Sequence, residues 1–583
     1  MGTPQTASLS GAATILAATL AAAPALLAST DLGSEQQRAD GKRLYDKYCA
    51  QCHGDTGDGQ GYATPRVKPE PRDFTSGKYK FRSTPSGTLP TDDDLRRAIR
   101  LGLPYTSMPG WPAFTDQQVQ NLVYYLKTFG GGFENPERHA PPISIGKPLE
   151  STEESIERGK VLYVEQGCAA CHGEGGRGNG LSAPTLVDDW GDHIRPIDLT
   201  QRWTFRGGPT KADIFRTFST GLNGTPMPSY ADVLEDEDRW HLVNYIYSLG
   251  DGDDPGYASL VVARFLEDEI ELERGEELFA EAAPARFPLV GQILEIGRNF
   301  YPSTTSIVVQ AVYNTREIAF LLRWNDMRAD TGGHNDPSLE VPHWDQDNPS
   351  AAAPTEAAED DFWGGAEAAS DDDFFGGLEE PAQEDGFDDF FGEALGAPAT
   401  ATGASEFSDA VALQLPQVLP TGIRKPYFLF GDSTAAVDLW FVDLARAAGD
   451  AVPVRQLVGR GSADLEPVVG DRFEARASYV DGEWRLLIKR PLDAISGVDF
   501  RQDLFVPIAF SVWDGFNRER GNKRAVSQWF YVYAEPREMP SPVRPMVTAA
   551  LAVLAVELLV IFAVRRRTRA RGRQLAGAAA GAR

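Results

Sequence analysis

The chain has 583 residues, too many for a single hydrophobic core, so we expect several domains. Its net charge of −28 and isoelectric point of about 4.7 argue against a nucleic acid as partner. The charge is uneven, because residues 345–405 hold 17 Asp and Glu and no Lys or Arg.

Residues 1–29 contain a run of small apolar residues that is typical of a secretory signal peptide. The positively charged start of such a peptide is missing, so the alternative is an uncleaved N-terminal anchor. Both interpretations place the following domains outside the cytoplasm.

The first motif with chemical content is Cys49-Ala50-Gln51-Cys52-His53, at the end of a helical pattern that opens at Ser34. C-x-x-C-H is the attachment signature of c-type haem, in which both thiols bond the porphyrin and the histidine can bind the iron. A disulfide or half a zinc site is the alternative. Zinc would need further soft ligands, and a redox-active thiol pair would not need the histidine.

The motif returns as Cys168-Ala169-Ala170-Cys171-His172, and the two copies use all four cysteines of the chain. A methionine flanked by proline follows each histidine at the same distance, 108 − 53 = 55 and 227 − 172 = 55 residues. An internal duplication is therefore predicted, with one haem site in each copy. Met108 and Met227 are candidate second ligands, since a thioether is a soft ligand for haem iron. The alternative is a methionine that fills a gap in the core.

Residues 34–131 and 152–250, joined by a linker at 132–151, each resemble a class I cytochrome c domain. The resemblance implies two haem c groups held by Cys49, Cys52, Cys168 and Cys171. It also implies axial pairs of His53 with Met108 and of His172 with Met227. An iron with both axial positions filled favours electron transfer over peroxidase or oxygen chemistry.

Residues 257–540 change character, because strand patterns and tight turns dominate. The run 306–313 turns at 314–317 into 318–324, and the run 473–479 turns at Asp481-Gly482 into 484–488. We expect further strands at 505–513 and 529–533. Many strands with tight turns predict a mainly-β, sandwich-like domain.

Several stretches of this domain resemble the haem b-binding γ-subunit of ethylbenzene dehydrogenase, among them Leu322-Arg323-Trp324-Asn325-Asp326, 408–414, 425–432 and 510–515. The resemblance implies a partner of the dimethyl sulfoxide reductase superfamily, a molybdenum enzyme with an iron-sulfur subunit. It also implies a haem b held by a methionine and a lysine. Lys523 lies where the lysine is expected, but Phe430 occupies the place expected for the methionine. A sheet domain that only docks a partner is the alternative.

The acidic segment 345–405 lies inside this domain and repeats Asp-Asp-aromatic-aromatic-Gly three times. Its low complexity predicts disorder. A solvated loop and a set of docking motifs for a basic partner are both consistent with the pattern.

Residues 546–564 form an apolar run long enough to cross a membrane, and the tail 565–583 is rich in arginine. The arginines predict a cytoplasmic tail, with the haem domains on the periplasmic side.

The sequence thus predicts a multidomain chain: two all-α cytochrome c domains, a mainly-β domain and one C-terminal transmembrane helix. The expected function is an electron-transfer subunit that relays electrons between redox partner proteins, here a molybdenum-type oxidoreductase and a respiratory carrier or oxidase. A peroxidase-like haem enzyme and a haem-based redox sensor or assembly scaffold are the rival hypotheses.

Overall fold

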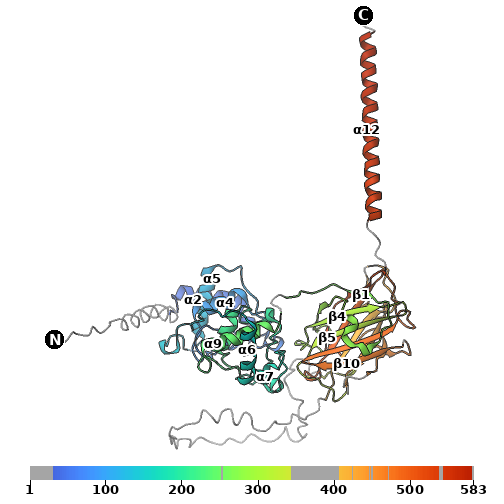
Figure 1. Ribbon diagram of the computed structural model, residues 1–583. Coiled ribbons are helices and arrows are strands. Elements are labelled where there is room, and N and C mark those ends of the chain that lie inside the picture. Colours follow the sequence, from blue (N-terminus) through green and yellow to red (C-terminus); the bar gives the residue numbers. More distant parts are fainter. Residues whose placement is uncertain are drawn as a thin grey trace, which may run out of the picture.

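The computed structural model describes residues 31–130, 132–250, 254–342, 406–422, 424–445, 447, 451–470, 472–537 and 543–580. A helical part, a sheet domain and a long C-terminal helix follow one another along the chain (Figure 1). The predicted signal or anchor segment 1–29 and the acidic segment 345–405 lie outside the described residues.

The first helical unit begins at Ser34, whose side chain accepts the Gln37 amide while the Gln37 side chain accepts the Ser34 amide. This reciprocal capping box fixes the start of the helix that leads to the first cysteine. The last long helix of the unit, over residues 116–126, continues into a 3₁₀ turn at 127–129. The elements are α2 (Glu35–Tyr48), α3 (Ala50–His53), η1 (Thr64–Arg66), α4 (Asp92–Leu101), α5 (Asp116–Leu126), η2 (Lys127–Phe129) and η3 (Pro136–Arg138).

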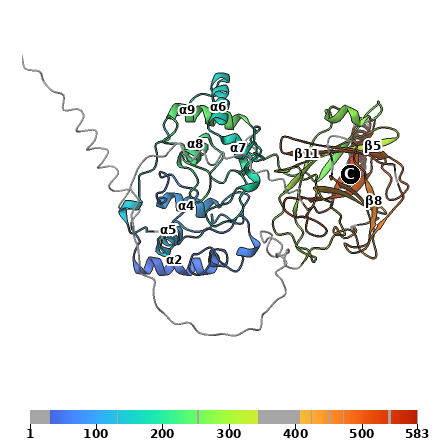
Figure 2. The same ribbon diagram turned by 90° about the horizontal axis from the view of Figure 1, so that it is seen from below.

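The second helical unit repeats this order, as the duplication predicts. Its elements are α6 (Glu153–Glu165), α7 (Cys168–His172), η4 (Ala183–Thr185), η5 (Arg202–Thr204), α8 (Lys211–Thr220) and α9 (Asp236–Ser248). In Figure 2, α7 lies on the side of the helical part that faces the sheet domain, and α2 lies far from it.

A glycine sets the crossing of the first and last helices in each unit. A Cβ atom at Gly41 of α2 would lie 2.0 Å from the Asn121 carbonyl oxygen of α5. A Cβ atom at Gly159 of α6 would lie 2.1 Å from the His241 carbonyl oxygen of α9. Only glycine permits this approach, so the two units share one helix packing.

Within the described residues, the sheet domain has fourteen connected strands. Eleven of them form a hydrogen-bonded path with order β10-β11-β5-β4-β1-β14-β12-β6-β7-β8-β9, and β2, β3 and β13 pair to its side. Strand β1 pairs in parallel with β4 and β14, and the other pairings are antiparallel. The strands are β1 (Leu260–Phe265), β2 (Ala285–Pro288), β3 (Val290–Gly291), β4 (Ser306–Tyr313), β5 (Glu317–Asn325), β6 (Ala410–Pro416), β7 (Val437–Asp443), β8 (Arg455–Gly459), β9 (Leu465–Pro467), β10 (Glu474–Val480), β11 (Glu483–Pro491), β12 (Phe505–Trp513), β13 (Ala525–Val526) and β14 (Phe530–Ala534). A 3₁₀ segment, η6 (Leu272–Phe279), packs against this sheet.

Strand β12 joins two sheets. Its residues 505–508 pair with β14, and its residues 509–513 pair with β6. One buried core contains side chains from both sheets, among them Phe320 of β5, Trp440 of β7 and Phe510 of β12. The sandwich-like prediction is confirmed, and the two sheets bring strand ends from distant parts of the chain together.

The predicted hairpins are present. Strands β4 and β5 pair around the turn at 314–316, and β10 and β11 pair around Asp481 and Gly482. Both turn residues have positive φ, 51° for Asp481 and 76° for Gly482. The dipeptide Asp-Gly tolerates positive φ at both positions. This backbone conformation matches the right-handed twist of the two strands in a two-residue hairpin.

The C-terminal helix α12 (Val543–Ala580) stands away from the other domains (Figure 1). An 18-residue window within Val543–Arg573 has a mean hydropathy of 2.7, and none of that window is buried. The helix is long and apolar enough to cross a membrane, as predicted for residues 546–564.

Candidate functional site

The four cysteines lie in short helical turns at the ends of α2 and α6, and none forms a disulfide. Burial raises the pKa of Cys49 to about 12 and that of Cys168 to about 11, so these thiols are protonated. This arrangement excludes the disulfide interpretation for the described structure. Free, partly buried thiols are what covalent attachment of a haem requires.

The two histidines are held in the same way. His53 Nδ1 lies 3.0 Å from the Arg72 carbonyl oxygen, and His172 Nδ1 lies 3.1 Å from the Ile197 carbonyl oxygen. Burial lowers the pKa of both imidazoles, which favours the neutral form. A neutral ring that donates from Nδ1 to a carbonyl keeps the Nε2 lone pair for a metal.

The two methionine loops are also equivalent. The Leu103 amide donates to the Met108 carbonyl oxygen over 3.0 Å, and the Leu222 amide donates to that of Met227 over 3.1 Å. Met227 packs against the core cluster that also holds Cys168. The iron ligation by Met108 and Met227 stays a prediction, supported by this common loop geometry.

Several buried donors in the two units are candidates to bind the carboxylates of a haem. Tyr79 Oη, Trp203 Nε1 and Arg206 Nε are buried and have no hydrogen-bond partner within the described residues. Burial, followed by the Arg72 charge, lowers the pKa of Lys80 to about 8. The unpaired atoms of Tyr79, Trp203 and Arg206 are costly to bury unless an acceptor reaches them. Sequence reasoning missed these residues, because isolated Tyr, Trp and Arg in loops give no pattern.

The loops of the two units contact each other across a charged interface. The Arg72 guanidinium lies 4.5 Å from the centre of the Trp190 ring. Arg82 is 3% exposed and donates to the carbonyl oxygen of Gly221 over 3.2 Å. Arg97 pairs with Asp213 at 2.8 Å. The loop that tethers His53 therefore packs directly on the second unit.

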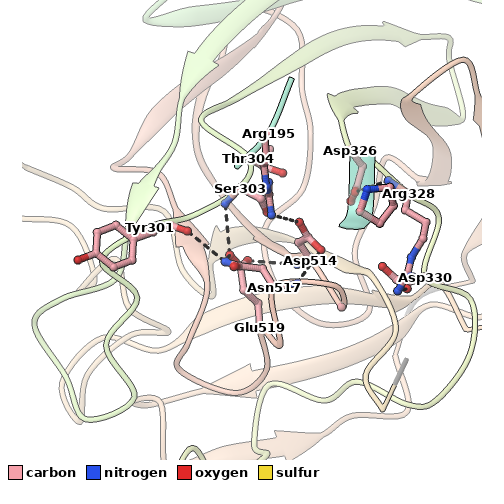
Figure 3. Close-up of polar contacts among 12 residues, drawn as sticks. Arg195, Tyr301, Ser303, Thr304, Asp326, Arg328, Asp330, Asp514, Asn517 and Glu519 are labelled. Atoms are coloured by element: carbon pink, nitrogen blue, oxygen red, sulfur yellow. Dashed lines mark hydrogen bonds and ion pairs between the residues drawn. The ribbon is translucent and has the colours of Figure 1, made fainter. Parts of the chain in front are cut away.

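The second unit also contacts the sheet domain. Asn325 Nδ2 donates to Asp198 Oδ2 over 2.7 Å, and Arg195 Nη2 lies 3.5 Å from Asp514 Oδ2 (Figure 3). Asp198 follows directly on Ile197, whose carbonyl oxygen holds His172. A short covalent path thus joins this domain contact to the second haem site.

Both positions considered for haem b are buried in the sheet domain. Lys523 is 1% exposed and Phe430 is 0% exposed. The Arg524 guanidinium lies 3.8 Å from the centre of the Phe430 ring, where an iron ligand would be needed. Phe430 has no donor atom, so it offers no ligand to an iron. Met327 is half-buried, and Met539 lies outside the described residues.

Two family models match the helical part. Residues 38–130 match cytochrome c, and residues 154–246 match subunit III of the cbb3-type cytochrome c oxidase. The matched ranges contain every predicted haem c residue. The two helical units are therefore cytochrome c domains.

Known proteins are similar to parts of the chain. A putative respiratory nitrate reductase haem subunit of Haloferax mediterranei is 29% identical over 29% of this chain and 60% of its own length. The chlorate reductase subunit gamma of Ideonella dechloratans is 27% identical over 21% of this chain and 50% of its own length. A solved chain of the Kuenenia stuttgartiensis reducing HAO-like protein complex Kustc0457/Kustc0458 is 46% identical, covering 36% of this chain and 96% of that chain, with a TM-score of 0.35.

This chain thus spans about half to three fifths of the length of these two curated relatives. One of these relatives is named as a haem subunit of a respiratory nitrate reductase, and the other as a subunit of chlorate reductase. The chain is similar to c-type cytochromes of membrane-linked electron transfer.

Proposed function

We propose that the protein is a membrane-anchored dihaem cytochrome c that serves as the electron-transfer subunit of an oxidoreductase complex, with its haem domains on the periplasmic side. The observation that carries the proposal is the repeated site. Both units place a C-x-x-C-H turn, an imidazole tethered through Nδ1 and a methionine loop in equivalent positions. Two equivalent haem sites favour electron transfer between partners over catalysis, because a catalyst needs only one reactive centre.

A bound haem would supply a one-electron carrier. The protein supplies the rest. The thioether-forming thiols hold the group on the chain, and the carbonyl oxygens of Arg72 and Ile197 fix the tautomer of each histidine. Met108 and Met227 would supply the second ligand of each haem, and a His/Met pair would raise its reduction potential.

The sheet domain serves as the docking module in this proposal and holds no haem b. Its contact with the second cytochrome domain, through Asn325 and Asp198, places it beside the second haem site. The resemblance to the γ-subunit of ethylbenzene dehydrogenase and the curated relatives named after nitrate and chlorate reductases support a molybdenum enzyme as the partner. Lys523 as a haem b ligand stays a prediction.

The haem content tests the proposal directly. We expect the detergent-solubilised full-length chain to give two haem c and no haem b per chain in a pyridine haemochrome assay with protein quantitation. Low-spin spectra that do not change on adding carbon monoxide or peroxide are expected in addition. A high-spin iron that binds these molecules would overturn the relay in favour of a peroxidase-like enzyme. Extractable haem b would overturn the role given to the sheet domain.

The match of residues 154–246 to an oxidase subunit favours a second partner class, a copper-containing terminal oxidase. The metal content of the complex isolated through a tag on this chain separates the two. Molybdenum in proportion to haem c supports the first partner, and copper with haem b in a separate subunit supports the second. A chain that purifies alone, without either metal, would contradict a stable complex.

A further inference from the structure

Three strand ends of the sheet domain meet at one buried place. Asp326 follows β5, Asp409 precedes β6 and Asp514 follows β12. Because β6 and β12 pair with Trp513 opposite Ala410, the last two acids lie at the same sheet edge. One carboxylate oxygen from each residue lies within 4.8 Å of those of the other two. The three residues are 6%, 0% and 1% exposed.

Backbone and indole donors hold these carboxylates in position. Asp409 accepts three hydrogen bonds, from Trp484 Nε1 at 2.9 Å, from the Asp330 amide at 2.7 Å and from the Gly515 amide at 2.8 Å. Asp514 Oδ1 accepts the Asn517 amide at 3.1 Å. The carboxylates are thus fixed by groups that do not move, as ligands of a pre-formed site are.

The positive charge at this place is too small for three carboxylates. The Arg195 guanidinium lies 3.5 Å from Asp514, and the Arg328 guanidinium pairs with a fourth acid, Asp330. Figure 3 shows Arg195 approaching Asp514 from one side, with Glu519 and Asn517 on the other. Burial, followed by the charges of the neighbouring acids, raises the pKa of Asp326 and of Asp409. Uncompensated negative charge in the interior calls for a proton or a cation.

A separate observation distinguishes Asp326 from the other two acids. Its Oδ1 accepts the Arg328 amide at 3.2 Å, whereas its Oδ2 is buried and has no hydrogen-bond partner within the described residues. A buried carboxylate oxygen without a donor is costly, and a bound cation removes that cost. The unsatisfied oxygen belongs to the carboxylate that converges with Asp409 and Asp514.

We propose that Asp326, Asp409 and Asp514 bind one hard divalent cation, calcium, which ties the two sheets together beneath the second cytochrome domain. All three ligands are carboxylates, and no histidine or cysteine belongs to the group, which favours calcium over the softer metals. Asp514 also contacts Arg195, so the ion stabilises the surface on which the cytochrome domain rests. The site is independent of the haems and of the proposed electron relay.

Calcium binding to the full-length haem-loaded protein tests this site. After chelator treatment and removal of the chelator, we expect equilibrium dialysis against calcium to show one bound ion per chain, measured by elemental analysis. Added calcium should raise the unfolding temperature by mass action. Asp326→Asn should weaken binding by roughly 100-fold, because loss of a supporting residue alone costs ~10–100-fold.

Asp438→Asn is the matched control. Asp438 is a buried acid of the same domain that also accepts an indole N–H, from Trp440 at 2.8 Å, but it does not belong to the cluster. This variant should keep the ion. The wild-type measurement needs no variant, so misfolding of Asp326→Asn cannot obscure the result. Wild-type protein that binds no calcium at millimolar concentration and shows no calcium-dependent unfolding temperature would overturn the proposal in favour of shared protons. Equal loss of the ion in both variants would also overturn the assignment.

Discussion

The two cytochrome domains share one construction but differ in the charge beside the haem histidine. In the first domain the tethering carbonyl belongs to Arg72, and in the second it belongs to Ile197. Burial is the largest cause that lowers the pKa of His53, and the Arg72 charge lowers it further. At His172 the corresponding charge effect comes from Asp198 and has the opposite sign.

A second difference lies in the ring that covers the histidine. Phe74 stacks on His53 with 4.6 Å between ring centres, and the second domain has Leu199 at the equivalent position. The equivalence follows from the backbone, since the Phe74 amide donates to Gly57 and the Leu199 amide donates to Gly176.

The charge difference sets the expected order of the two reduction potentials. A positive charge such as that of Arg72 stabilises the ferrous state, so the first site should have the higher reduction potential. With a donor at the sheet domain, electrons would then run from the second site to the first.

The largest effect is expected from removing one attachment site. Cys49→Ala with Cys52→Ala should leave one covalent haem per chain, because only the second motif can then form thioether bonds. The pyridine haemochrome ratio and the intact mass report the loss. The corresponding change in the second domain, Cys168→Ala with Cys171→Ala, should also leave one covalent haem per chain. That haem should have the reduction potential of the first site. Two covalent haems in either variant would contradict the assignment.

Replacing a methionine by histidine should lower one potential and leave the other unchanged. A His/Met pair raises the potential of haem iron, and axial ligands span roughly 0.8 V among proteins. Met108→His should therefore move only the higher wave in a redox titration, and Met227→His only the lower wave. If one substitution shifts both reduction potentials, then that methionine does not act only on the haem of its own domain.

The haem c residues were predictable because covalent attachment requires a fixed local spacing, so Cys49 to His53 can be recognised in isolation. The hairpin at Asp481 and Gly482 was predictable for the same local reason. Asp326, Asp409 and Asp514 were not, because their proximity depends on β12 crossing from one sheet to the other. No spacing in the chain encodes that crossing.

The haem b prediction was uncertain for a related reason. A lysine at the expected sequence position does not specify the space around it, and only the packing showed Lys523 and Phe430 to be enclosed. Arg72 likewise looks like any loop arginine until its carbonyl oxygen is seen to hold His53. Long-range packing, rather than residue type, decides these roles.

An intermediate effect is expected at the interface between the two domains. Arg82 is 3% exposed and donates to carbonyl oxygens of both domains, Tyr79 at 3.2 Å and Gly221 at 3.2 Å. Arg82→Met should leave these acceptors buried and unpaired, which costs about 2–4 kcal/mol. Denaturant unfolding measures the loss. Arg43→Met is the control, because its side chain is 69% exposed and its ion pair contributes little.

The smallest effect tests the origin of the difference between the domains. Arg72→Leu keeps the carbonyl that tethers His53 but removes the charge, so the higher potential should fall towards the lower one while the haem count stays at two. The lower potential should shift less, because the charge that acts on His172 comes from Asp198 and not from Arg72. Arg43→Leu changes the net charge equally at an exposed position, and screening should make its effect negligible. If Arg72→Leu and Arg43→Leu shift the potentials equally, then Arg72 does not set the order of the two sites. The Asp198 charge beside His172 and the Phe74 ring, which Phe74→Leu converts to the side chain found in the second domain, would then be the remaining local differences between them.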